Sequence, residues 1–112
     1  MRPGLYKASF STPLDEGAGV VTITESRIQG GDSSYWYSGS YSSDGRRIQA
    51  RLKVRHHSSF LSSVFGPLRD FDLILQGDDG GSTAFLKGQT PQMAGVSITI
   101  RLGLLEAQNV AG

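Results

Sequence analysis

Cysteine is absent from the 112 residues of the chain. Disulfide bonds, thiolate zinc sites and a cysteine nucleophile are therefore excluded, and the fold must be stable without covalent cross-links. A chain without cysteine fits a reducing compartment, and we expect this protein to be cytoplasmic.

Long apolar runs are also lacking. No stretch approaches the roughly 20 apolar residues that a membrane-spanning helix needs. Residues 1–7 turn polar before the apolar core of a signal peptide could form. We therefore expect neither a signal peptide nor a membrane span, and no membrane partner.

Neither sign of charge dominates the sequence. The 11 lysine and arginine residues against 10 aspartate and glutamate residues give a formal net charge of +1. Proteins that track nucleic-acid phosphates usually carry a basic excess, and the pattern of a recognition helix is missing too. We do not expect a nucleic-acid partner, so any argument from charge must concern a local patch.

Residue patterns typical of catalysis or metal binding are missing. His56 and His57 are the only histidines, and neighbouring residues of a strand point to opposite faces, so they cannot share one metal ion. No spacing indicates a triad of serine, histidine and aspartate. We expect one histidine ring to be packed and the other solvated. We expect no metal, no cofactor and no enzymatic activity.

Adjacent carboxylates occur in two places, Asp15 with Glu16 and Asp78 with Asp79. Both pairs lie beside glycines, where acidic residues are common because they support turns. We therefore expect solvated loop tips at these positions and not a catalytic acid and base.

Alternation of apolar and polar residues is the dominant pattern, in a chain that is 38% apolar and 19% charged and contains 15 glycines. In residues 47–57, for example, Ile48, Leu52 and Val54 share one face of an expected strand. The segments with this pattern, clear or weak, are 5–11, 19–24, 27–30, 35–41, 47–57, 71–75, 82–89 and 96–104. They predict about eight strands in one all-β domain over residues 1–112.

One interval breaks the alternation. Phe60, Leu61, Val64 and Phe65 recur at helical spacing behind serines that could cap a helix, which predicts one short helix near residues 58–66. Eight short antiparallel strands avoid exposed sheet edges most simply by closing into an up-and-down barrel. An open sandwich is the alternative.

The expected strand at 47–57 carries the strongest local charge. Five of the 11 cations lie in it or next to it: Arg46, Arg47, Arg51, Lys53 and Arg55. Arg51, Lys53 and Arg55, here named the cationic stripe, project together because alternate residues of a strand share a face. The stripe is either a solvated face that protects the sheet or a patch that binds a protein partner.

Three tyrosines, Tyr35, Tyr37 and Tyr41, share one face of their expected strand, and Trp36 points the other way. If the tyrosines point inward, they form part of the barrel wall. If they point outward, they suit a homodimer or partner interface, where tyrosine is enriched. Both alternatives remain open at this point.

The apolar faces of the other strands would line the interior of a barrel. The candidates are Leu52, Val54, Phe71, Leu73, Phe85, Ile98, Ile100 and Leu102. Eight strands enclose an interior just wide enough to be filled by side chains or to hold one small ligand. An intracellular carrier of a small apolar ligand is therefore one possible function.

Three parts of the sequence are distinctive: residues 4–7 with Phe10, residues 30–41 (GGDSSYWYSGSY), and Ser63-Val64-Phe65. In this order they resemble the GrlR-like family, negative regulators of type III secretion gene expression, and the resemblance runs over most of the chain. It implies an eight-stranded, lipocalin-like antiparallel barrel that forms dimers and acts by binding a protein. In the best-known case that protein is a transcriptional activator.

The resemblance also implies a partner-binding turn, which in the family contains four consecutive carboxylates. The matching positions here are Ser43, Asp44, Gly45 and Arg46, and only Asp44 is acidic. The charge of the turn thus falls from four negative charges to about zero, which would reverse the electrostatic complementarity that such recognition needs.

Two hypotheses follow from the sequence. The first is a non-enzymatic, dimeric regulatory protein that binds a protein partner, for example a transcriptional regulator, through this turn or the cationic stripe. The alternative is the carrier of a small apolar ligand in the barrel interior.

Overall fold

Eight β-strands make up the computed structural model, which describes residues 1–57 and 70–108. The strands are β1 (Gly4–Ser11), β2 (Glu16–Ile23), β3 (Arg27–Gly31), β4 (Tyr35–Ser43), β5 (Arg47–His56), β6 (Phe71–Asp79), β7 (Thr83–Thr90) and β8 (Met93–Ala107). The short helix predicted near residues 58–66 lies outside the described residues.

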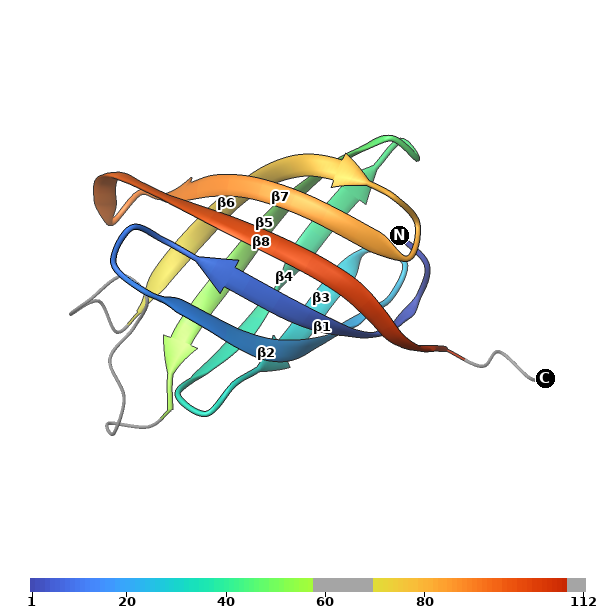
Figure 1. Cartoon of the computed structure of the whole chain (residues 1–112), viewed down its shortest axis with the longest axis horizontal. Helices are drawn as coiled ribbons and strands as arrows, with labels where there is room; N and C mark the ends of the chain where they lie inside the picture. The colour runs from blue at the N-terminus through green and yellow to red at the C-terminus, as the bar shows by residue number, and fades with distance from the viewer. Residues whose placement is uncertain (58–69, 109–112) are drawn as a thin grey trace.

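The strands form a closed barrel in sequence order (Figure 1). Each strand pairs antiparallel with the next, and β8 pairs antiparallel with β1 to close the sheet. The predicted antiparallel up-and-down barrel is confirmed, and the open sandwich is wrong. No helix among the described residues is long and apolar enough to cross a membrane.

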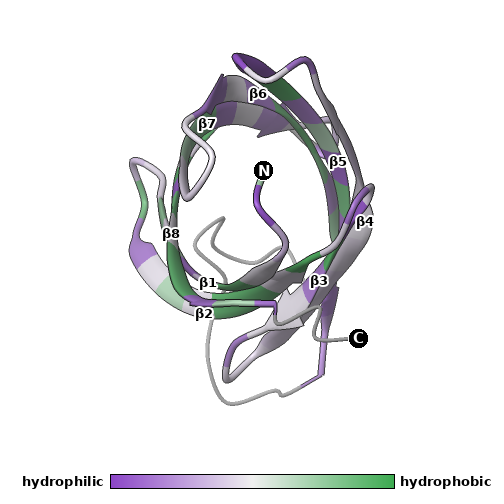
Figure 2. Ribbon diagram, turned by 90° about the vertical axis from the view of Figure 1, so that its right-hand side faces the viewer, coloured by the Kyte–Doolittle hydropathy of each residue, from purple (hydrophilic) through white to green (hydrophobic). Residues whose placement is uncertain are grey.

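Alternation along each strand decides which side chains enter the barrel. In β5, Ile48, Ala50, Leu52 and Val54 are buried, and the residues between them are exposed. Polar and apolar bands alternate along this strand in Figure 2, which looks along the barrel. Because the sheet is closed, the inward residues of all strands meet in one core.

Some strand ends differ from the prediction because turn chemistry and strand pairing overlap there. β2 begins at Glu16 and not at residue 19, since Glu16 pairs with Ser11 and the turn is confined to residues 12–15. The Thr12 hydroxyl accepts hydrogen bonds from the backbone N–H groups of Leu14 and Asp15 there, at 3.2 and 3.3 Å. At the other acidic pair, β6 continues through Asp79.

The barrel has two different ends. The β1–β2, β3–β4 and β7–β8 hairpins lie at one end, which is named the cavity end here (Figure 1). The β2–β3, β4–β5 and β6–β7 hairpins lie at the other end together with Met1, and it is named the N-terminal end. The two ends differ in how far the interior is filled.

A glycine in β6 allows the close approach of β7. A Cβ atom added to Gly77 would lie 1.8 Å from the carbonyl oxygen of Phe85, so Gly77→Ala must push the two strands apart. We expect this variant to lower the free energy of unfolding by about 2 kcal/mol, the usual cost of overpacking. Urea denaturation measures the change.

Gly103→Ala is the matched control, because no other atom would lie within 4 Å of its Cβ. It should change the free energy of unfolding by less than about 0.5 kcal/mol. Equal stability of the two variants would contradict the close pairing of β6 with β7.

Candidate functional site

A cavity of about 310 Å³ lies inside the barrel. Its wall is mostly apolar and takes residues from every strand. The apolar lining residues are Ala8, Phe10, Ala18, Val21, Ile28, Tyr35, Tyr37, Ala50, Leu52, Val54, Phe71, Leu73, Leu75, Leu86, Ile98, Ile100 and Leu102. The volume is about twice that of the 150 Å³ apolar cavity known to accept benzene, and it reaches the range of small-molecule sites.

Small residues on β1 and β2 make room for the aromatic rings that border this space. Ala8 pairs with Gly19, and Gly17 lies beside the ring of Phe10. A Cβ atom on Gly19 would lie 2.8 Å from the Tyr37 hydroxyl oxygen, so only glycine makes room for this ring. The glycines of β2 therefore hold the Phe10 and Tyr37 rings close to the strand, and Ala8 contributes a small side chain to the cavity wall.

Aromatic rings surround the cavity toward the cavity end. Phe10, Tyr35, Tyr37 and Phe71, here named the aromatic collar, all line it. The rings of Phe10 and Tyr37 meet edge to face with centroids 6.1 Å apart, and those of Tyr35 and Phe71 lie 5.9 Å apart. The His56 ring packs against Tyr35 at 5.0 Å. His56 is half-buried and His57 is exposed, as predicted.

Asp32 orders the β3–β4 turn at the rim of the cavity. Its Oδ1 accepts hydrogen bonds from the backbone N–H groups of Ser34 (2.8 Å) and Tyr35 (2.7 Å), and its Oδ2 accepts one from the Tyr37 hydroxyl. Burial raises the pKa of the Tyr37 hydroxyl well above its usual range, and the hydrogen bond to Asp32 and the charge of Asp32 raise it further. Tyr37 is therefore a neutral donor at physiological pH.

The Ser34 hydroxyl has no hydrogen-bond partner among the described residues, although Ser34 is only 4% exposed and lines the cavity. An unpaired buried hydroxyl is costly unless something else satisfies it. Neither Asp32 nor Ser34 was predicted from the sequence as a site residue. An aspartate in a Gly-Gly-Asp turn that bonds the N–H groups two and three residues on is a known turn signal and could have indicated Asp32.

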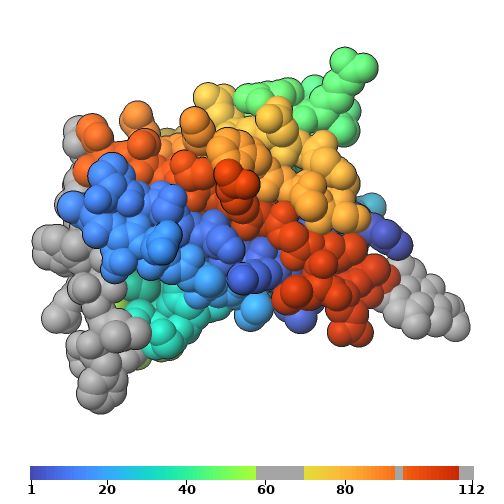
Figure 3. All heavy atoms as spheres, viewed as in Figure 1, coloured from blue at the N-terminus to red at the C-terminus, as the bar shows by residue number. Residues whose placement is uncertain are grey.

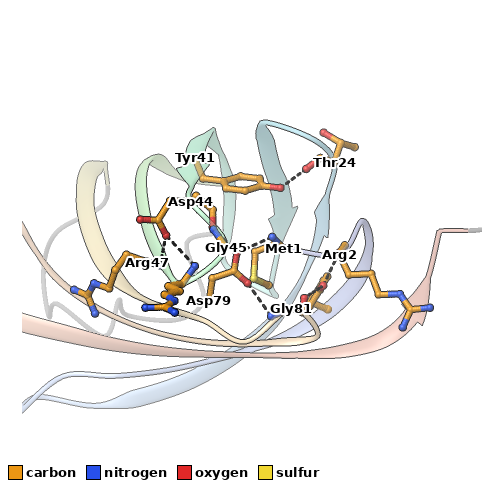
Figure 4. Close-up of polar contacts among 12 residues, drawn as sticks. Met1, Arg2, Thr24, Tyr41, Asp44, Gly45, Arg47, Asp79 and Gly81 are labelled. Atoms are coloured by element: carbon orange, nitrogen blue, oxygen red, sulfur yellow. Dashed lines mark hydrogen bonds and ion pairs between the residues drawn. The ribbon is translucent and has the colours of Figure 1, made fainter.

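The N-terminal end is closed by the chain's own first residues, and Met1 lies inside the ring of strands (Figure 2). The Met1 ammonium group forms a 2.7 Å ion pair with Asp79, and both side chains are almost fully buried (Figure 4). Asp79 also accepts hydrogen bonds from the Ser43 hydroxyl (2.5 Å) and the Gly81 N–H (2.8 Å). The prediction that Asp79 lies in a solvated loop tip is wrong, since this distant ammonium group draws it inward.

Two tyrosines fill the same end. The Tyr6 hydroxyl donates to the carbonyl oxygens of Arg2 and Gly81, and the Tyr41 hydroxyl donates to that of Thr24 at 2.6 Å. Burial, and then the charge of Asp79, raises the pKa of both hydroxyls. Both hydroxyls thus remain neutral. Because these two rings fill the N-terminal end, the cavity lies toward the cavity end of the barrel.

The structure decides between the alternatives for the three tyrosines. Tyr35, Tyr37 and Tyr41 are 6%, 8% and 9% exposed, so they form barrel wall and core and do not present an interface for a second copy. Trp36 points outward and is 43% exposed, as predicted.

Seven of the eight residues predicted to line the interior do so: Leu52, Val54, Phe71, Leu73, Ile98, Ile100 and Leu102. The prediction for Phe85 is wrong. Ala84 and Leu86 are buried on either side of Phe85, so the ring lies on the outer face, where Arg101 and Lys87 lie over it at 5.1 and 5.8 Å. These cation–π contacts give the outward ring a partner.

The cationic stripe lies on the outer face of β5. Arg55 donates to Asp72 at 3.4 Å and to the carbonyl oxygens of Val54 and Phe71. Arg51 and Lys53 are exposed and form no ion pair with any described residue. The stripe therefore has two available cations, not three.

The turn from Ser43 to Arg46 uses its polar side chains locally. Asp44 Oδ1 accepts from the backbone N–H groups of Arg46 and Arg47, both at 2.8 Å, and these bonds lower the pKa of the Asp44 carboxyl (Figure 4). Ser43 bonds Asp79, and Gly45 has a φ of 93°, which favours glycine. Asp44 and Arg46 are both exposed, so the turn presents one charge of each sign.

Among the known proteins compared, no family model matches the chain and no curated protein matches it. The resemblance to the GrlR-like family therefore stays a prediction from the residues quoted above.

The buried ion pair at the N-terminal end predicts a pH-dependent contribution to stability. Burial raises the pKa of Asp79, but the Met1 ammonium group and the hydrogen bonds from Ser43 and Gly81 outweigh this and hold it below its usual value. A lowered carboxyl pKa stabilises the fold fully above the unfolded pKa of about 3.9, and this contribution is lost as pH falls through the folded pKa.

Asp79→Asn should therefore lower the free energy of unfolding by about 3 kcal/mol at pH 7, because it leaves the ammonium group buried without its counter-charge. The difference from the unaltered chain should shrink below about pH 4. Asp78→Asn is the control, because its ion pair with Arg47 is exposed and contributes less than about 1 kcal/mol. Equal losses in the two variants, measured by urea denaturation between pH 3 and 7, would contradict the buried pair.

Proposed function

We propose that the protein is a non-enzymatic carrier that binds a small apolar molecule inside its barrel. The observation that carries the proposal is the cavity of about 310 Å³, whose wall is mostly apolar. An unfilled apolar cavity costs stability, because its wall forgoes dispersion contacts that a ligand could provide. The carrier was the second hypothesis from sequence, and it is the function that the geometry supports best.

The ligand would reach the cavity from the cavity end. The lining includes Asp15 and Glu16, which are exposed at the rim. The outer face over β1, β2, β7 and β8 is covered by side chains and shows no opening in the space-filling view (Figure 3). At the opposite end, Met1 and Asp79 fill the interior.

The size of the cavity predicts how affinity depends on ligand length. Each buried CH₂ group contributes about 0.8 kcal/mol, or about a fourfold decrease in Kd. For the neutral alcohols hexanol, octanol and decanol we expect Kd to fall by this factor per carbon until the cavity is full. Titration calorimetry measures the three values, since Trp36 lies outside the barrel and its fluorescence does not report on the interior.

Two neighbouring residues of β5 provide a matched pair of variants. Ala50 lines the cavity and Gln49 is exposed on the outer face. Ala50→Phe should weaken decanol binding at least tenfold, and Gln49→Phe should leave it unchanged. Ala8→Val is a milder way to fill the cavity if Ala50→Phe does not fold. Absence of alcohol binding would overturn the proposal. Equal decanol binding by the unaltered protein and by a folded variant with a filled cavity would overturn it too.

A second candidate is a regulator that binds a protein partner through the outer surface, as the resemblance to the GrlR-like family implies. The exposed cations Arg51 and Lys53 support it, because they lie on one strand face and form no ion pair with any described residue. The proposal includes a cytoplasmic location, a lipocalin-like relationship and a homodimer, whose contact surface would not be the buried tyrosines.

Reversal of these charges tests the second candidate. Arg51→Glu with Lys53→Glu should abolish co-purification of a partner that the unaltered protein retains, because an acidic patch on that partner would then be repelled. The control is Arg47→Glu with Asp78→Arg, which swaps an exposed ion pair on the same sheet. Unchanged partner recovery by the stripe variant would rule the stripe out.

A further inference from the structure

Carboxylates are the charged groups at the cavity rim. Asp15, Glu16 and Asp32 line the cavity, and no lysine or arginine does so among the described residues. Asp32 accepts three hydrogen bonds, the acceptor-only role of an ionised carboxylate. A ligand that places its polar group at this rim therefore meets negative charge.

A second, independent observation is the hydroxyl of Ser34. It is buried, lines the cavity, and has no hydrogen-bond partner among the described residues. Its backbone N–H donates to Asp32 Oδ1, so the hydroxyl belongs to the same turn as that carboxylate. A ligand with a hydrogen-bonding head group would satisfy this hydroxyl, whereas a purely apolar ligand would leave it unpaired.

The aromatic collar is a third feature that favours a cationic head group. The rings of Phe10, Tyr35, Tyr37 and Phe71 lie between the rim and the apolar interior. The faces of aromatic rings attract cations, and groups of such rings commonly bind substituted ammonium ions. The carboxylates and the rings thus favour the same class of head group.

We propose that the ligand is an amphiphile with a cationic amine head and an apolar body of roughly a dozen non-hydrogen atoms or fewer, a size set by the cavity volume. The inference rests on the proposed carrier function and names its ligand class. The apolar body occupies the cavity. The ammonium group stays at the rim, near Asp15, Glu16 and Asp32, and donates a hydrogen bond to the Ser34 oxygen.

A series of ligands with one chain and three head groups tests the inference. Decylamine, decanol and decanoate differ in head-group charge at pH 7, and the alkyl body of decanoate is one carbon shorter, which by itself accounts for about a fourfold difference in Kd. We expect Kd for decylamine to be at least tenfold lower than for decanoate, with decanol between them. Added salt should weaken decylamine binding and leave decanol binding unchanged, because screening acts on exposed charges. Titration calorimetry of the full chain gives all three constants.

Variants then identify the residues that cause the preference for decylamine. Asp15→Asn with Glu16→Gln should reduce the advantage of decylamine over decanoate severalfold without changing decanol binding. Glu25→Gln is the control, since Glu25 is exposed in the hairpin turn at the N-terminal end and is not among the lining residues. Ser34→Ala should weaken decylamine and decanol, and unchanged urea denaturation confirms that the fold is intact.

The outcomes separate the two proposals. Binding of decanoate as tightly as decylamine would overturn the cationic head group and leave the carrier function standing. Failure of all three ligands to bind would overturn the carrier function itself. A decylamine preference that survives Asp15→Asn with Glu16→Gln would overturn the assignment to this rim, and so would a preference that is lost in Glu25→Gln.

Discussion

The pairing of β8 with β1 is the constraint on which the rest of the structure depends. It runs from Gly4 opposite Ala107 to Ser11 opposite Thr99, with one register shift between Leu5 and Tyr6. Closure gives every described strand two neighbours and gives the sheet an inside. A slip of one residue would turn Tyr6 outward and expose the apolar face of β1, so the register is strongly specified.

Once the sheet is closed, side-chain size divides the interior. Tyr6, Ile23 and Ile48 are fully buried large residues of the core, whereas the small residues Ala8 and Ala50 line the cavity. The same backbone therefore encloses packed core in one part and empty space in the other. The cavity is thus a property of a few small residues and not of the barrel geometry alone.

Much of the fold follows from local alternation, and the parts that do not follow have identifiable physical reasons. Alternation in β5 is unambiguous because polar residues separate its apolar ones. Phe85 lies between Ala84 and Leu86, so three apolar residues in a row do not reveal which face is inside. The sequence around Asp79 resembles a turn, because nothing nearby indicates the partner of this carboxylate. That partner, the Met1 ammonium group, lies 78 positions away. The apolar wall of the site was predictable from the sequence. The unpaired Ser34 hydroxyl was not, because it depends on burial, which a local pattern does not reveal.

The ammonium group at Met1 has a practical consequence for anyone who produces the protein. A chain extended before Met1, by an affinity tag or the residues left after its cleavage, would carry a neutral amide at this position. Asp79 would then be buried beside that amide, and the added segment would have to leave the barrel through the end that Met1 closes. Residues placed before Met1 would therefore destabilise this end of the barrel.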